Sequence, residues 1–185
     1  MPVLICMLRG VNLGPHNRMK MDALRALCGS LKLEDPRTYV QSGNVIFRTK
    51  EKSIASLTKK IQDAIAREFK FRPEVVLRTT DELRRAIAAS PFAGREDLEP
   101  GKILVTFLTA EPGPDAGATL AKFKEYPEEI HLTGREMYIY FPNGAGKSKL
   151  PWSSVERLLK TTGTARNWNS VTKMLEIAEE LEATG

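Results

Sequence analysis

The spacing of apolar residues over the first 80 positions predicts strands and helices in a regular order. The continuous apolar run Val3–Leu8 is typical of a buried strand, and apolar residues then recur at helical spacing over 21–31. Residues 38–47 contain two short strand patterns around a glycine-containing turn, which indicates a hairpin. An amphipathic helix over 54–69 and a strand over 74–77 complete the order β-α-β-β-α-β, which is that of a ferredoxin-like unit.

The same order begins again after a short helix. Residues 79–82 read Thr-Thr-Asp-Glu, the sequence of a capping box, so we expect a helix to begin there. A buried strand over 102–108, a helix over 116–123 and a hairpin over 129–141 follow. A second capping-box sequence at 153–156 predicts one more helix.

No strand pattern follows that helix, and the chain finishes with an amphipathic helix over about 167–181. We therefore expect an α+β fold of two ferredoxin-like (α/β-plait) units with mainly antiparallel sheets. The second unit is expected to lack its last strand and to be followed by a C-terminal helix, which we expect to pack on the first unit. The predicted division is 1–80 for the first unit, 81–101 for a helix and connecting loop, and 102–185 for the second unit and the last helix.

Composition and charge narrow the class of protein. The 185 residues include 42% hydrophobic and 28% charged residues, a mixture typical of globular proteins. No apolar run approaches the roughly 20 residues of a membrane span, and no signal peptide is visible. Residues 1–90 carry 17 Lys and Arg against 9 Asp and Glu, whereas residues 91–185 carry 11 against 14. A basic first half is compatible with an anionic partner, and equally with a solvated surface.

The predicted topology brings two polar loops of the first unit together. In a ferredoxin-like sheet, strands one and two run the same way with strand three between them, so the loop after Leu8 approaches the hairpin turn at 41–44. Such loops on a rigid sheet commonly carry binding sites. The candidate ligand-binding residues are Arg9, Asn12, Asn17, Arg18, Gln41, Ser42 and Asn44, with Arg166 as a further member. The alternative is that Asn and Gly satisfy turn geometry and that Arg9 and Arg166 hold neighbouring segments by hydrogen bonds.

Three segments carry a family resemblance. Leu8–Gly14 resembles the Leu-Arg-Gly-Ile-Asn-Val-Gly signature of a widespread group of bacterial proteins, with Val11 and Leu13 as conservative departures. Thr38–Phe47 and Thr164–Val171 resemble the second and third blocks of the same group. The group is domain-of-unknown-function family 1697. The resemblance implies a pair of α/β-plait units, and it implies no activity or catalytic residue.

A glycine-rich segment suggests a weaker anion site. The residues concerned are Gly144, Gly146, Lys147, Ser148 and Lys149. A phosphate-binding P-loop would need glycine at position 141, where the sequence has Phe141, and a helix beginning at the Lys-Ser pair. Pro151 disfavours that helix, so we expect no nucleotide hydrolysis from this segment. The glycines and lysines could still form a backbone concavity for a phosphate or carboxylate, or a plain surface turn.

Other chemistry has little support in the sequence. Cys6 and Cys28 occupy apolar positions typical of small core residues, and a reduced, cytoplasmic location is expected. His16 and His131 have no ligand spacing around them, so no metal or cofactor is expected. The sequence leaves open whether the protein is an enzyme, and its oligomeric state. The favoured function is binding of a small anionic or phosphorylated ligand at the loop end of the first sheet. The alternatives are nucleic-acid binding through the basic half and a protein-interaction role without catalysis.

Overall fold

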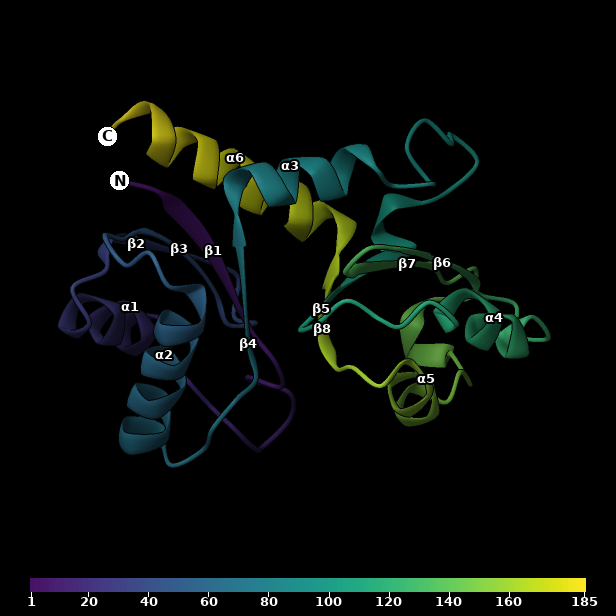
Figure 1. Ribbon diagram of the computed structural model, residues 1–185, viewed down its shortest axis with the longest axis horizontal. Coiled ribbons are helices and arrows are strands. Elements are labelled where there is room, and N and C mark those ends of the chain that lie inside the picture. The colour runs from purple at the N-terminus through teal and green to yellow at the C-terminus, as the bar shows by residue number, and fades with distance from the viewer. The chain divides into compact units, whose positions relative to one another are not determined.

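The computed structural model describes residues Met1–Gly185 and contains two four-stranded antiparallel sheets (Figure 1). The first sheet has the strand order β2-β3-β1-β4. Its elements are β1 (Val3–Leu8), α1 (Met21–Ser30), β2 (Glu34–Tyr39), β3 (Asn44–Arg48), α2 (Ile54–Phe69) and β4 (Val75–Thr79). The predicted α+β class and the β-α-β-β-α-β order of the first unit are therefore confirmed.

The central strand β1 is buried along its whole length because both faces of the first sheet are covered. On one face, Leu4, Cys6 and Leu8 join a core with apolar residues of α1 and α2. On the other face, Arg48 of β3 donates to the carbonyl of Leu181 at 2.6 Å. Burial on both faces explains why β1 is a continuous apolar run rather than an alternating one.

The contacts within the chain define two compact units. The first unit comprises Met1–Arg84 and Thr172–Gly185, and the second comprises Arg85–Val171. The divisions fall inside two helices, α3 (Thr80–Ala88) and α6 (Trp168–Ala183). The expectation that the last helix packs on the first unit is confirmed, because Arg37 and Arg84 form ion pairs with Glu180 and Glu179 of α6.

The second unit repeats the order of the first and corrects one prediction. Its elements are β5 (Ile103–Leu108), α4 (Ala116–Leu120), β6 (Glu129–Thr133), β7 (Glu136–Tyr140), α5 (Trp152–Leu159) and β8 (Gly163–Asn167), with short 3-10 turns η1 (Pro100–Lys102), η2 (Ala121–Phe123) and η3 (Ala145–Lys147). The prediction that this unit lacks its last strand was wrong. β8 pairs antiparallel with β5 and completes a sheet of order β6-β7-β5-β8.

A close approach of two strands explains why β8 begins with glycine. A Cβ atom at Gly163 would lie 2.6 Å from the carbonyl oxygen of Phe107 and 3.0 Å from Cγ2 of Thr106. Any side chain there would force β5 and β8 apart. The strand continues as Thr-Ala-Arg-Asn, which has none of the large apolar residues that mark a buried strand in a sequence.

The two predicted capping boxes differ in outcome. In the first, Thr79 Oγ1 accepts from the Glu82 amide at 3.1 Å, and Glu82 Oε2 accepts from the Thr79 amide at 2.9 Å, so this box is confirmed. The second is wrong, because α5 begins at Trp152, after Pro151, and no side chain caps it. The amides of Ser154 and Val155 instead donate to the backbone carbonyl of Pro151, at 2.9 and 3.0 Å.

Candidate functional site

Backbone hydrogen bonds bring the loop after β1 and the β2–β3 hairpin together. The amide of Leu8 donates to the carbonyl of Gly43 at 3.0 Å. The amide of Arg9 donates to the carbonyl of Glu74, also at 3.0 Å. A Cβ at Gly43, whose φ is +77°, would lie 2.9 Å from Cβ of Leu8, so glycine is required at this contact. The polar segments 9–20 and 40–43 therefore meet at one end of the first sheet, as their topology predicts.

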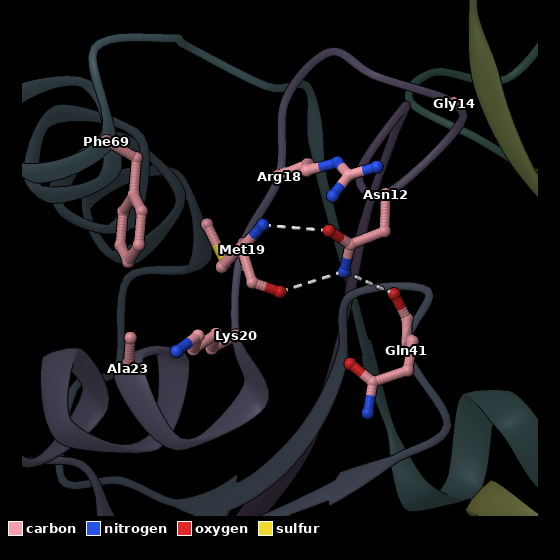
Figure 2. A pocket seen from close by; sticks show the side chains of 8 residues that line it. All are labelled: Asn12, Gly14, Arg18, Met19, Lys20, Ala23, Gln41 and Phe69. Atoms are coloured by element: carbon pink, nitrogen blue, oxygen red, sulfur yellow. Dashed lines mark hydrogen bonds between the residues drawn. The ribbon is translucent and has the colours of Figure 1, made fainter.

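Asn12 fastens the 9–20 loop through three hydrogen bonds. Its side-chain oxygen accepts from the amide of Met19 at 2.8 Å. Its Nδ2 donates to the carbonyl of Met19 at 2.9 Å and to the carbonyl of Gln41 at 2.6 Å. Figure 2 shows these bonds converging on the Asn12 amide from the far side of the loop and from the hairpin. One side chain thus closes the loop and joins it to the hairpin.

A pocket of about 610 Å³ lies beside this fastening, and it is called the first pocket below. Its lining residues are Asn12, Gly14, Arg18, Met19, Lys20, Ala23, Gln41 and Phe69 (Figure 2). Two of these residues are cations and none is acidic. Arg18 and Lys20 are exposed and form no ion pair within the protein, unlike Arg25 nearby, which pairs with Asp22. The pocket therefore carries uncompensated positive charge.

The other predicted site residues of the first unit lie outside the lining of this pocket. Arg9 pairs with Glu74 at 3.3 Å. Asn17 donates to the carbonyl of Gly10 at 3.3 Å. Asn44 is fully buried and donates to Ser42 Oγ at 3.0 Å and to the carbonyl of Tyr39 at 3.2 Å. Their recorded contacts hold the two loops in shape, while Arg18 and Gln41 present side chains to the pocket.

Arg166 belongs to the second unit. It lies in β8, is 7% exposed, and donates to Thr164 Oγ1 at 2.6 Å and to the carbonyl of Ala165 at 2.8 Å. The next residue, Asn167, accepts from the amide of Asn169 at 2.8 Å, which caps the start of α6 as its residue type predicts.

Sequence reasoning missed Lys20 and Phe69, which also line the first pocket. Lys20 lies immediately before α1, where a basic side chain interacts unfavourably with the helix dipole. A cation at this unfavourable position could have been recognised in the sequence as a candidate binding residue. Phe69 is the last residue of α2 and continues its apolar stripe, so nothing in the sequence separates it from a core residue.

The glycine-rich segment forms the short turn η3 rather than the start of a helix. Gly144 has a φ of +82°, which favours glycine, and Ser148 Oγ accepts from the amide of Leu150 at 3.1 Å. Lys147 and Lys149 line a separate pocket of the second unit, whereas Gly144, Gly146 and Ser148 do not. No group of three or more His, Cys, Asp or Glu is placed to hold a metal ion, and no helix is long and apolar enough to cross a membrane.

The fold and the first pocket define a two-unit α+β protein whose polar loops surround a basic cavity. The chain belongs to the family described as "Protein of unknown function (DUF1697)", whose model matches residues 1–138. A solved structure with the same fold is "The structure of conserved bacterial protein SP0830 from Streptococcus pneumoniae". It has a TM-score of 0.71 and 20% sequence identity, and the match covers 96% of this chain and 98% of that one. No curated protein matches the chain.

Proposed function

We propose that this protein binds a small anionic ligand, such as a phosphate ester or a carboxylate, in the first pocket. The observation that carries the proposal is the lining itself: Arg18 and Lys20 face the pocket without any acidic neighbour in it and without an ion pair elsewhere. Cations that have no carboxylate partner in the folded protein are available to an anion from solution.

The rest of the lining suits a ligand with both polar and apolar parts. The backbone carbonyl of Gln41 accepts a hydrogen bond from Asn12. The side-chain amide of Gln41 forms no hydrogen bond within the protein, so it offers a ligand both a donor and an acceptor. Phe69 and Met19 supply an apolar wall. A volume of about 610 Å³ lies within the range of about 300–1,000 Å³ that is usual for small-molecule sites.

Asn12 has a positioning role in this proposal. Its three hydrogen bonds are made to the protein backbone, so its amide is occupied before any ligand arrives. By fixing the loop at Met19 and the hairpin at Gln41, it sets the separation of the two segments that carry the cations and the free amide.

Calorimetric titration tests the proposal with inorganic phosphate, pyrophosphate and a nucleoside monophosphate at low ionic strength. Binding of at least one probe is expected, and Arg18→Ala and Lys20→Ala should each weaken it about tenfold, since a hydrogen bond to a charged group contributes about 1.5–3 kcal/mol. Lys52→Ala is the matched control, because Lys52 is exposed and lies outside the pocket, and the substitution removes the same charge. Its affinity should equal that of the wild type.

Two results would count against a small-ligand site. One is no binding of any of the three probes at millimolar concentration. The other is binding of a single-stranded oligonucleotide that falls steeply with salt and weakens equally in Arg18→Ala and Lys52→Ala, because that pattern belongs to a diffuse nucleic-acid interface.

A further inference from the structure

The second unit contains a pocket of its own, of about 480 Å³, which is called the second pocket here. It is lined by Glu125, Tyr126, Pro127, Glu128, Asn143, Lys147 and Lys149. Glu129 at the start of β6 pairs with Tyr140 at the end of β7, so the segments that precede β6 and follow β7 meet at one end of the second sheet. The pocket lies between these two segments.

Its charged side chains are of both signs, and they are unpaired. Two glutamates come from the segment before β6, and two lysines come from the segment after β7. None of the four forms an ion pair or a side-chain hydrogen bond. Elsewhere in the second unit, opposite charges do pair, as Arg95 does with Glu129 at 2.9 Å and Lys102 with Glu99 at 2.8 Å. The carboxylates and the ammonium groups of the second pocket are therefore both available to a ligand.

Glu128, one of the lining residues, has a carboxylate oxygen without a partner in the protein. Glu128 Oε2 is buried and accepts no hydrogen bond. A buried acceptor without a donor is costly, and buried carboxylate oxygens in proteins are normally bonded. The protein supplies no cation to this carboxylate, and a primary ammonium group bound in the pocket would balance its charge.

We propose that the second pocket binds a small zwitterion that carries a primary ammonium group and an anionic group. The ammonium group lies against the carboxylates of Glu125 and Glu128, and the anionic group lies against Lys147 and Lys149, with Asn143 able to donate to it. A simple anion would face Glu125 and Glu128, and a simple cation would face the two lysines, so only a ligand with both charges is matched on both sides. This proposal uses none of the residues of the first pocket and stands independently of it.

Amino acids and phosphorylated amines share this chemistry, and the experiment separates them. NMR titration of the whole protein follows the backbone amides of Asn143 and Lys147, which report on the second pocket rather than the first, and uses alanine and phosphoethanolamine as zwitterions. Propionate, ethylamine and inorganic phosphate are the single-charge counterparts. At least one zwitterion should bind ten times more tightly than either of its halves, and the stronger of the two identifies a carboxylate or a phosphate as the anionic group.

Variants test the two sides of the pocket separately. Glu128→Gln keeps the size of the side chain but removes its charge, and Lys147→Ala removes one cation, so each should weaken zwitterion binding about tenfold. Lys124→Ala, an exposed lysine outside the lining, should leave it unchanged. Melting temperatures within about 2 °C of the wild type show that the variants are folded. Equal affinity for zwitterions and their halves, or wild-type affinity in both pocket variants, overturns the proposal.

Discussion

Replacing Asn12 with alanine should lower the free energy of unfolding of the first unit by about 2.5–5.5 kcal/mol. Three hydrogen bonds to the backbone of Met19 and Gln41 are lost, each with a net contribution of about 0.5–1.5 kcal/mol. Asn12 also has a φ of +56°, a left-handed conformation that asparagine tolerates better than alanine, which adds about 1 kcal/mol.

Asn17→Ala is a matched control for the backbone part of this cost. Asn17 lies in the same loop with a φ of +52°, but its side chain makes a single recorded bond of 3.3 Å, to the carbonyl of Gly10. The two alanine variants therefore share the conformational penalty and differ in the number of bonds lost. Asn12→Asp separates the bonds further, because it keeps the acceptor for the Met19 amide and removes both donors.

Urea unfolding measures the free energies, and amide hydrogen exchange reports the bond itself. Asn12→Ala and Asn12→Asp should both be less stable than Asn17→Ala, because the aspartate would set a carboxylate oxygen against the carbonyls of Met19 and Gln41. Exchange of the Met19 amide should accelerate in Asn12→Ala and stay protected in Asn12→Asp. Equal free energies for Asn12→Ala and Asn17→Ala would refute the assignment of Asn12 as the residue that fastens the loop.

Three further predictions concern other parts of the chain. Gly163→Ala should lower the free energy of unfolding, measured by denaturant melts, by more than about 2 kcal/mol, because its Cβ would lie 2.6 Å from the Phe107 carbonyl oxygen. A decrease below about 0.5 kcal/mol would contradict that contact. Val40 is exposed and has a φ of +51°, a left-handed conformation that is unfavourable for a β-branched residue. Val40→Asn should therefore raise the free energy of unfolding by about 1 kcal/mol and the melting temperature by roughly 2–4 °C, and a lower melting temperature would argue against strain there. Burial raises the pKa of the Cys28 thiol to about 12, so it should not react with a thiol reagent at pH 8 until urea unfolds the chain, and reaction in the native protein would show that the site opens.

The pH dependence of stability should include a contribution from Glu129. Its pKa is lowered by the hydrogen bond from His131 at 2.9 Å and, to a smaller extent, by Arg95. Stabilisation by a carboxylate with a depressed pKa is present above the ordinary value of 4.5 and is lost as the pH falls through the lower value in the folded protein. Glu129→Gln should therefore weaken the acid sensitivity of the melting temperature below about pH 4.5, and an unchanged profile would exclude this contribution.

The parts of the fold that could be predicted are those that bury large apolar side chains. β1 and β5 are apolar runs because helices or loops cover both of their faces, and the amphipathic helices follow the same rule. β8 could not be predicted, because its contact with β5 depends on the absence of a side chain at Gly163. β2 was recognised only in its second half, since Glu34–Tyr39 is a partly exposed strand that includes Pro36 and a register shift against β3.

The meeting of the two polar loops was predictable from the sequence, whereas the lining of the first pocket was not. Topology alone brings the loop after β1 to the β2–β3 hairpin. The sequence does not show which polar side chains form hydrogen bonds within the protein, because that depends on atomic distances. Asn12 and Asn44 carry amides that could bind a ligand, but both amides form hydrogen bonds with atoms of the neighbouring loops. Lys20 and Phe69 reach the pocket from the ends of helices, a placement that no local motif marks.

The division of α6 has a consequence for the order in which the chain folds during synthesis. Arg48 binds the carbonyl of Leu181 and Thr184 Oγ1, and both belong to the segment Thr172–Gly185 that completes the first unit. A ribosome makes that segment only after all of Arg85–Val171, which is continuous in sequence. The second unit can thus finish folding while the first still lacks the helical segment that Arg48 binds. Nascent chains paused before residue 172 would be the stage at which a chaperone has most to protect.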